Sequence, residues 1–377
     1  MELPLQYDLL DKPNTIRDGL QALRTKSILA IDIEADSLYA YLEKVCLVQI
    51  STSSRNTIID PLLGKDAMPA LGTLLADASI TKVFHGGDYD IRLLKKDLGF
   101  PVRNVVDTMI AAQFTGRPNL GLAALVEEHF HVHLTKKYQR ANWAARPLDA
   151  DRLHYAALDT AYLLELWKRL RSELSGLGRL AWAQEEFSLL EAVIPAPSRA
   201  PSCFDIKGAT KLKPRQRAVL QALVLLRDEV SRAWDRPPFK VFSNKVLLYW
   251  ADSPPLSRRE VLRTPSASKT HLHRLAPRIV DAVRRARATP VDACPVRSSP
   301  GSYTPVTEVQ NLRLKRLKQA RLKAAARLGL PLGLLVNSKT LEALSRADPG
   351  QAVEQLASSL KQWQWQALGP ALQHALP

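Results

Sequence analysis

The chain has 377 residues, of which 46% are hydrophobic and 24% are charged. This length predicts two or three domains, and the composition excludes wholesale disorder, a collagen-like chain and a coiled coil. Residues 1–195 carry 22 Lys/Arg and 25 Asp/Glu, whereas residues 196–377 carry 31 and 12. This asymmetry predicts two tasks. The basic half suits a polyanion such as nucleic acid, and the alternative is a charged surface that serves only solubility.

Cysteine use and hydropathy bear on location. The three cysteines, Cys46, Cys203 and Cys294, form no metal-binding spacing and no disulfide framework, which is typical of a reducing compartment. The first residues lack the basic and apolar regions of a signal peptide, and no apolar run reaches the ~18 residues of a membrane span. We therefore expect a cytoplasmic protein without a membrane partner, and a monomer by default.

The first half reads as strands followed by helices. Strands are predicted at 27–34, 44–51 and 56–60, joined as an antiparallel meander, and further short strands at 81–84 and 104–107. Helices are predicted at 66–77 and 88–98. From Thr108 to about Leu190 the pattern is helical, with breaks near 116–118 and 146–147. This order predicts an α/β sandwich over residues 1–195.

Two stretches rich in Pro and Ser, at 195–209 and 290–305, predict linkers. They set off two small helical modules, at 210–290 and 306–377. The first module has 18 Lys/Arg and six Asp/Glu over residues 210–289, and the second contains a basic helix near 313–329.

Four carboxylates and one tyrosine form the informative pattern. Asp32 and Glu34 lie two residues apart in the first predicted strand, so they point to one face while Ile31 and Ile33 point to the other. Two like charges on a buried strand are costly unless a cation neutralises them.

Asp90 falls in the first turn of a predicted helix, and Tyr155 and Asp159 share one helix face at a spacing of four. Each residue also has a simpler interpretation when it is taken alone. Asp32 and Glu34 could lie on a solvated strand edge, and Asp90 could be a carboxylate at a helix start. Tyr155 could be a half-buried core residue, and Asp159 an exposed acid. Together they suit phosphodiester hydrolysis with two divalent ions, either Mg²⁺ or Mn²⁺, bound by Asp32, Glu34, Asp90 and Asp159. The Tyr155 hydroxyl would orient the attacking water or help to deprotonate it.

The sequence resembles a known family. Three segments are similar to the exonuclease motifs of the DEDD superfamily: DIEADS at 32–37, FHGGDYDIRLL at 84–94 and HYAALDTAYLLELW at 154–167. The third segment has the Tyr-x-x-x-Asp spacing of the tyrosine subgroup. YQRANWAARPL at 138–148 resembles the segment before the third motif in ribonuclease D and its exosome-associated relatives. Residues 214–251 resemble an HRDC domain, and the last module resembles a second, degenerate copy.

The resemblance implies an RNase H-like exonuclease domain followed by two HRDC-type domains. It implies a 3′→5′ exoribonuclease that releases 5′-mononucleotides from precursor tRNAs and other small structured RNAs. The four metal ligands of the family correspond to Asp32, Glu34, Asp90 and Asp159, and its motif tyrosine to Tyr155. Asp88 is an extra carboxylate in the second motif, and its position favours Asp90 as the ligand. Asp36 is expected to form hydrogen bonds rather than to bind metal.

Candidate RNA contacts are residues with a basic or imidazole side chain near the motifs or in the first basic module. They are His85, Lys136, Lys137, Arg140, Arg146, Arg215, Arg217, Lys240 and Lys245. The alternative for each is a turn residue or a solvated surface. Asp107 is expected to cap a helix. Two other functions stay open, namely an inactive RNA-binding scaffold and a DNA-directed 3′→5′ exonuclease.

Overall fold

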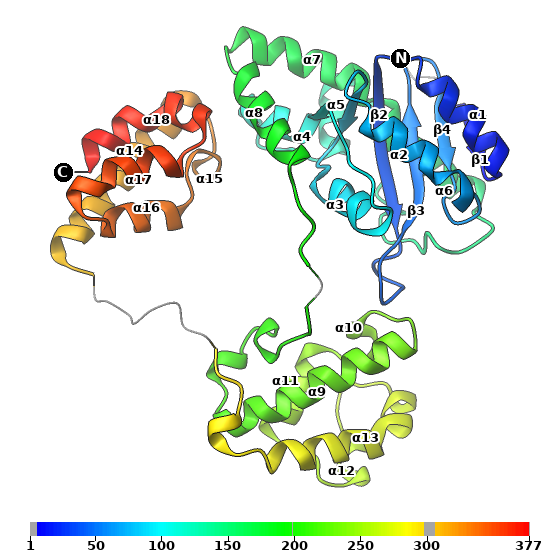
Figure 1. The fold of residues 1–377 in the computed structure, drawn as a ribbon, viewed down its shortest axis with the longest axis vertical. Coiled ribbons are helices and arrows are strands. Elements are labelled where there is room, and N and C mark those ends of the chain that lie inside the picture. Colours follow the sequence, from blue (N-terminus) through cyan, green and yellow to red (C-terminus); the bar gives the residue numbers. More distant parts are fainter. Residues whose placement is uncertain (1–5, 198, 298–305, 377) are drawn as a thin grey trace. The chain divides into compact units, whose positions relative to one another are not determined.

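The computed structural model describes residues 6–197, 199–297 and 306–376. By the density of its internal packing the chain forms two compact units. The first comprises the chain up to Ala35, Val45–Pro195 and the segment from Thr304 onward, and the second comprises Asp36–Lys44 and Ala196–Tyr303. Figure 1 labels most of the elements of both units.

A six-stranded mixed sheet is the centre of the first unit. Its strands are β1 (Tyr7–Leu10), β2 (Ile28–Ala35), β3 (Val45–Ser51), β4 (Asn56–Ile59), β5 (Thr81–Phe84) and β6 (Val105–Asp107), in the order β1-β4-β3-β2-β5-β6. β3 is antiparallel to β2 and to β4, and the other neighbours are parallel. The predicted β2-β3-β4 meander is therefore confirmed. β1 and the helix after it, α1 (Pro13–Leu23), were not predicted. Three of the four β1 residues are half-buried and Leu9 is exposed, so this edge strand gives little periodic signal.

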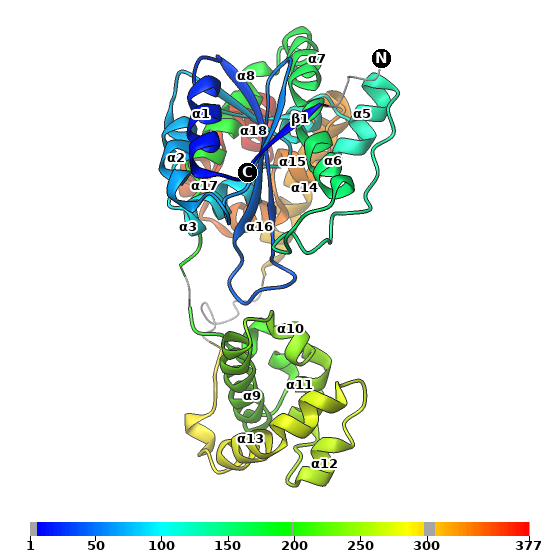
Figure 2. The same ribbon diagram turned by 90° about the vertical axis from the view of Figure 1, so that its right-hand side faces the viewer.

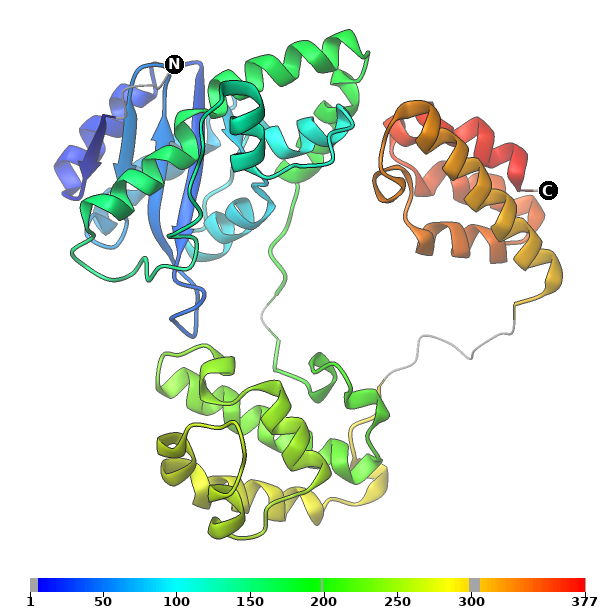
Figure 3. The same cartoon turned by 180° about the vertical axis from the view of Figure 1, so that it is seen from behind.

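Helices cover both faces of this sheet (Figures 2 and 3). Ile31 and Ile33 of β2 pack with α1, α2 (Met68–Ala76) and α3 (Asp88–Asp97), and a 3₁₀ turn at Lys65–Ala67 precedes α2. The opposite face is covered by α6 (Ala150–Ala161) and α7 (Leu163–Gly176). The remaining helices here are α4 (Thr108–Phe114), α5 (Leu122–Phe130) and α8 (Leu180–Glu191).

The structure has no helix over residues 131–149. The predicted break near 146–147 is therefore confirmed, and the expectation of helix is wrong for residues 131–145. Trp143 is 1% exposed and anchors this segment. The Arg146 guanidinium also holds it, donating from Nε to Asp60 (2.6 Å) and from Nη2 to the Cys46 carbonyl oxygen (2.9 Å). Long-range contacts of this kind leave no periodic pattern in the sequence.

The second unit is helical, as predicted. It contains α9 (Pro214–Ala233), α10 (Pro238–Val241), α11 (Asn244–Asp252), α12 (Arg258–Leu262) and α13 (Lys269–Arg287), with short 3₁₀ turns at Cys203–Asp205, Ala209–Lys211 and Val291–Ala293. Its core includes Cys203 and Ile206, which precede the predicted start of the module at residue 210. The segment Asp36–Lys44 belongs to this unit, and the Tyr41 hydroxyl donates to Asp228 (2.8 Å).

The last helices are α14 (Glu308–Leu328), α15 (Leu332–Leu335), α16 (Ser338–Arg346), α17 (Pro349–Ser359) and α18 (Gln362–Ala375). They share one hydrophobic core with α4, α7 and α8. Trp363 of α18 meets Phe114 edge-on at 4.9 Å between ring centroids, and Lys361 Nζ lies 2.6 Å from Glu186. The division into three domains stays a prediction, and residues 298–305 of the second predicted linker lie outside the described residues. No described helix combines the length and the apolar character that crossing a bilayer requires.

Candidate active site

β2 presents Asp32 and Glu34 side by side. Alternation along the strand buries Ile31 and Ile33 on the opposite face, at 0% and 6% exposure, and leaves the two carboxylates partly accessible. β2 lies between β3 and β5, so its backbone is fixed from both sides. The predicted orientation of the two acids is confirmed.

α6 brings Tyr155 and Asp159 to the same face of the sheet. The side chain of Asp149 caps this helix by accepting from the N–H of Arg152, and the helix packs across β2, β3 and β4. A buried hydrogen bond of 2.6 Å joins Thr160 Oγ1 to Ser51 Oγ on β3. It pins the helix to the sheet one residue after Asp159, so the Asp159 carboxylate is held over β2.

Three of the four predicted acids converge. Carboxylate oxygens of Asp32, Glu34 and Asp159 all lie within 4.8 Å of one another. Burial raises the pKa of Asp32 to about 7 and that of Asp159 well above its usual range. The pKa of Glu34 is also raised, first by burial and then by the charges of Asp32, Asp159 and Asp90.

This donor set fits a divalent cation. Among the described residues, no cationic side chain lowers the pKa of Asp32, Glu34, Asp90 or Asp159. Packed carboxylates without a counter-charge are unstable as a group of anions, and hard ions such as Mg²⁺ and Mn²⁺ prefer oxygen ligands. The cluster is therefore suited to a divalent metal.

Asp90 stands beside this triplet rather than within it. It is 8% exposed and lies in the first turn of α3, outside the set of mutually close oxygens. Burial raises its pKa well above the usual value, and the charges of Asp32, Asp107 and Asp159 raise it further. Asp88, by contrast, is exposed and pairs with Arg92 at 2.9 Å. The structure thus separates the two neighbouring acids by burial, and the assignment of Asp90 rather than Asp88 as a metal ligand stays a prediction.

Asp107 fixes the turn that leads to Asp90, and sequence reasoning saw only part of this role. Its carboxylate caps α4 by accepting from the N–H groups of Met109 (2.8 Å) and Ile110 (3.0 Å). It also accepts from Gly86 (3.1 Å) and Gly87 (2.7 Å), between β5 and α3. One buried side chain thus connects two turns. The sequence signal for this contact was the Gly86-Gly87 pair after β5, the strand that precedes β6 in the chain.

Tyr155 is 6% exposed, and its ring packs against Tyr138 and Trp143. Burial raises the pKa of its hydroxyl, and so do the charges of Asp159, Glu34 and Asp32. The hydroxyl therefore keeps its proton, which favours orienting a water over removing a proton from it.

Gln49 is a feature that the sequence did not suggest. It lies directly across the strand pair from Asp32, is 0% exposed, and neither atom of its side-chain amide has a hydrogen-bond partner among the described residues. Cross-strand neighbours share a face of the sheet, so a polar group stands next to the carboxylates. Its signal was a polar residue inside the apolar strand VCLVQIS.

The predicted RNA contacts differ in exposure and fall into three groups. Arg146 is bonded to Asp60 and to backbone carbonyl groups, which gives it a structural role. His85 and Arg217 are half-buried, and His85 Nδ1 lies 2.9 Å from Thr108 Oγ1. The others are exposed, in the 131–149 segment and in the second unit: Lys136, Lys137, Arg140, Arg215, Lys240 and Lys245. Contacts of these residues with RNA stay predictions. Asp36 accepts from the N–H of Lys44 (2.7 Å), as expected of a hydrogen-bonding residue.

Known proteins resemble the chain in both sequence and fold. Residues 7–175 match the family model described as 3′-5′ exonuclease, and residues 216–283 match the HRDC domain. Ribonuclease D from Pseudomonas paraeruginosa is 29% identical over 355 residues, covering 94% of this chain and 93% of that protein. The crystal structure of Escherichia coli RNase D, titled as an exoribonuclease involved in structured RNA processing, has a TM-score of 0.74 at 26% identity and covers 98% of each chain.

Eukaryotic relatives are longer. The exosome complex exonuclease RRP6 of Saccharomyces cerevisiae is 29% identical over 311 residues, which cover 77% of this chain but 42% of that protein. The chain thus spans less than half the length of this relative. The resemblance to the exonuclease motifs and to the HRDC domain is confirmed, and so is an RNase H-like exonuclease fold followed by an HRDC domain and further helices. The chain is therefore similar to ribonuclease D over most of its length, and it combines a 3′-5′ exonuclease domain with an HRDC domain.

Proposed function

We propose that the chain is a metal-dependent 3′→5′ exoribonuclease that shortens the 3′ ends of precursor tRNAs and other small structured RNAs. The convergence of Asp32, Glu34 and Asp159, with Asp90 beside them, carries this proposal. The relatives named for ribonuclease D and RRP6 support RNA as the substrate class.

In this proposal Asp32, Glu34, Asp90 and Asp159 hold two divalent ions, Mg²⁺ or Mn²⁺. When bound, such ions activate a water and stabilise the leaving 3′-oxygen. The side chains of the protein position the reactants. Tyr155 keeps its proton and orients the water, and Asp107 fixes the turn that carries Asp90. Water attacks the phosphorus between the last two nucleotides, and the bond from this phosphorus to the 3′-oxygen of the penultimate nucleotide breaks. The hydroxyl of the water stays on the phosphorus, a proton passes to the displaced 3′-oxygen, and the last nucleotide leaves as a 5′-mononucleotide.

The basic residues beyond the site suit the RNA backbone. Lys240 and Lys245 of the second unit are exposed, and Phe239 and Tyr249 nearby in sequence are 54% and 47% exposed. Lysines beside exposed aromatic rings are typical of single-strand binding surfaces. We further propose that the protein acts as a cytoplasmic monomer. The three cysteines are free and buried, which agrees with a reducing compartment.

The test is a product ladder. RNA that carries a 5′ label and a 3′-extended tRNA would be incubated with the protein in Mg²⁺ or Mn²⁺, and in chelator. We expect stepwise shortening from the 3′ end in either metal and none in chelator. A DNA oligomer of the same sequence tests the DNA-directed alternative, which faster DNA cleavage would establish. RNA binding without any shortening in metal would establish the scaffold alternative and overturn the proposal.

A further inference from the structure

The last helices enclose a groove that the active site does not use. It lies between α14 and α18, next to Val353 of α17, and has a volume of about 1060 Å³. This volume is slightly above the range that is usual for small-molecule sites, roughly 300–1,000 Å³, so the groove suits part of a polymer better than a single small ion.

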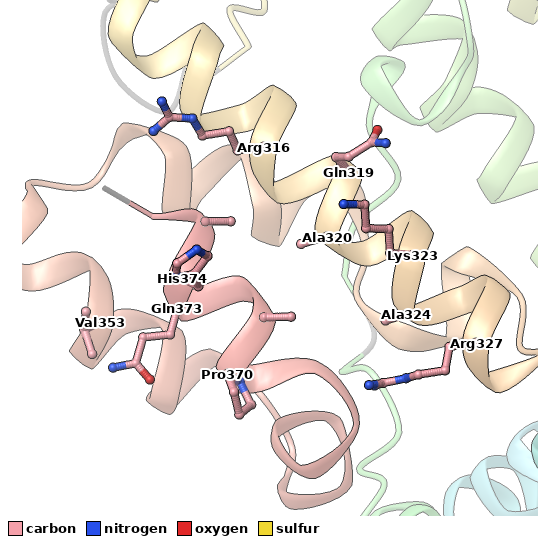
Figure 4. Close-up of a pocket in the computed structure, with 12 residues that line it drawn as sticks. Arg316, Gln319, Ala320, Lys323, Ala324, Arg327, Val353, Pro370, Gln373 and His374 are labelled. Atoms are coloured by element: carbon pink, nitrogen blue, oxygen red, sulfur yellow. The ribbon is translucent and has the colours of Figure 1, made fainter.

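One face of α14 lines this groove. Arg316, Lys323 and Arg327 recur at spacings of seven and four, close to whole turns of a helix, so they form a row along one side (Figure 4). At 1.5 Å per residue the first two are about 10 Å apart along the axis and the last two about 6 Å. Ala320 and Ala324 occupy the same face and keep the wall between the cations shallow.

The opposite wall comes from α18. Pro370 and Ala371 add apolar surface, and Gln373 and His374 add an amide and an imidazole (Figure 4). None of the described residues that line the groove is acidic. Arg327 donates one bond from Nη2 to the Ala367 carbonyl oxygen (2.8 Å), which fixes its direction. Lys323 is exposed, and no hydrogen bond or ion pair engages it in the part of the chain that the structure describes.

The chemistry of this groove selects a linear polyanion. A row of cations suits successive phosphates, and small apolar residues between them leave room for sugars and bases. Amides and an imidazole can contact the bases by hydrogen bonding and stacking. The rest of α14 adds to the positive potential of the groove, because the whole helix carries seven Lys/Arg and one acid, Glu308.

We propose that the α14–α18 groove binds single-stranded RNA through its backbone, as a second contact for the substrate of the active site. The identity of the polyanion rests on the proposed exoribonuclease function. The groove contains none of the four carboxylates, so its removal leaves the hydrolytic centre intact.

The test compares two double variants of the full chain with equal charge changes. R316E/K323E alters the groove, and K318E/K339E alters exposed lysines of α14 and α16 that do not line it. Fluorescence anisotropy with a labelled single-stranded RNA of about 20 nucleotides, in chelator, gives the dissociation constant at several salt concentrations. Circular dichroism and the thermal midpoint show whether each variant folds.

We expect R316E/K323E to weaken RNA binding at least 10-fold and to reduce the salt slope by about 1.4, at about 0.7 per lost phosphate contact on a single strand. K318E/K339E should stay within about 3-fold of wild type. Lys323→Ala alone should weaken RNA binding by about 2- to 5-fold. This variant removes a charge without reversing it, so it controls for an effect of charge reversal on folding. Equal losses in the two double variants would overturn the proposal, as would poly-glutamate that binds the groove as tightly as RNA does.

Hydrolysis separates this proposal from the proposed function. With a dinucleotide in Mg²⁺, which is too short to reach a second contact, R316E/K323E should act at the wild-type rate, whereas with a long RNA below saturation it should act more slowly. No hydrolysis by the wild type would refute the exoribonuclease function and leave the binding result standing. Unchanged rates on long RNA, together with unchanged binding, would refute the groove alone.

Discussion

Asp32, which we propose as a metal ligand, illustrates how a buried carboxylate conflicts with stability. Its pKa in the folded chain, about 7, exceeds its ordinary value of 3.8 because of burial. The folded state therefore holds this proton more tightly than the unfolded state does. The resulting stabilisation is complete below pH 4 and disappears as pH rises through 7, and above pH 7 the ionised group opposes folding.

The first prediction follows because ionised Asp32 opposes folding above pH 7. Without metal at pH 8, Asp32→Asn should unfold at a higher denaturant concentration than wild type. We expect its free energy of unfolding to be higher by roughly 1–2 kcal/mol, below the maximum of ~4 kcal/mol that the pKa difference allows. The gain should shrink toward pH 4. Denaturant titrations in chelator at pH 4, 6 and 8 measure it. Added Mg²⁺ should stabilise wild type and have a smaller effect on the variant. A variant that is less stable than wild type at pH 8 would contradict the idea of a strained anionic cluster.

Asp90 and Asp88 provide a matched pair, two residues apart in the same helix. Asp90→Asn removes a buried acid beside the cluster. We expect the rate of nucleotide release to fall by roughly 10³-fold, because the transition state loses several kcal/mol of metal-dependent stabilisation. Asp88→Asn removes one exposed partner of Arg92 and should stay within about 3-fold of wild type. Single-turnover rates on one RNA measure both, and similar rates for the two variants would contradict the assignment.

Strands were predicted better than the connections between them. β2, β3 and β5 begin and end within a residue or two of their expected bounds, because β-branched residues and alternation mark them locally. The face occupied by Asp32 and Glu34 followed from the same alternation. Residues 131–145 were wrongly predicted as helix, because Trp143 and Arg146 hold this segment through contacts with distant residues. Gln49 was missed for a related reason: its position opposite Asp32 depends on strand register.

Asp107 carries a prediction at the scale of elements. It joins the β5–α3 turn to the start of α4 through four N–H groups. Asp107→Ala removes a cap and leaves buried donors unpaired, so the free energy of unfolding should fall by about 2–4 kcal/mol. Asp107→Asn keeps one carbonyl acceptor and should lose about half as much.

The activity of Asp107→Asn reveals whether the residue positions Asp90. Measured well below its unfolding temperature, the variant should release nucleotides about 10-fold more slowly than wild type with an unchanged affinity for RNA. A variant that is less stable but fully active would show that the clamp serves folding only. Chemical denaturation and single-turnover kinetics on the same preparation separate these outcomes.

At the scale of the molecule, the last helices and the exonuclease domain share a core. The charge asymmetry and the linkers indicated separate modules, and the sequence could not show that Trp363 packs against Phe114 and Trp182. These residues are about 180–250 positions apart, so no local pattern connects them. Glu185 strengthens the joint by accepting from the N–H groups of Gln362 and Trp363 (2.8 Å each), at the start of α18.

Trp363→Ala tests this shared core. Trp363 is 1% exposed, so its truncation should cost about 3–5 kcal/mol. Because the core is common, α4 and α8 should lose hydrogen-exchange protection together with α18. Loss of protection confined to α14–α18 would show that the last helices are stabilised independently of the exonuclease domain.

We propose that Asp32, Glu34, Asp90 and Asp159 act as one metal-dependent hydrolytic centre for RNA. The most direct measurement compares Asp32→Asn with wild type on the same 3′-extended tRNA in Mg²⁺, recording binding and nucleotide release side by side. The account predicts RNA affinity within about 3-fold of wild type and a rate of release lower by roughly 10³-fold or more. Nucleotide release by the variant at the wild-type rate would contradict the account.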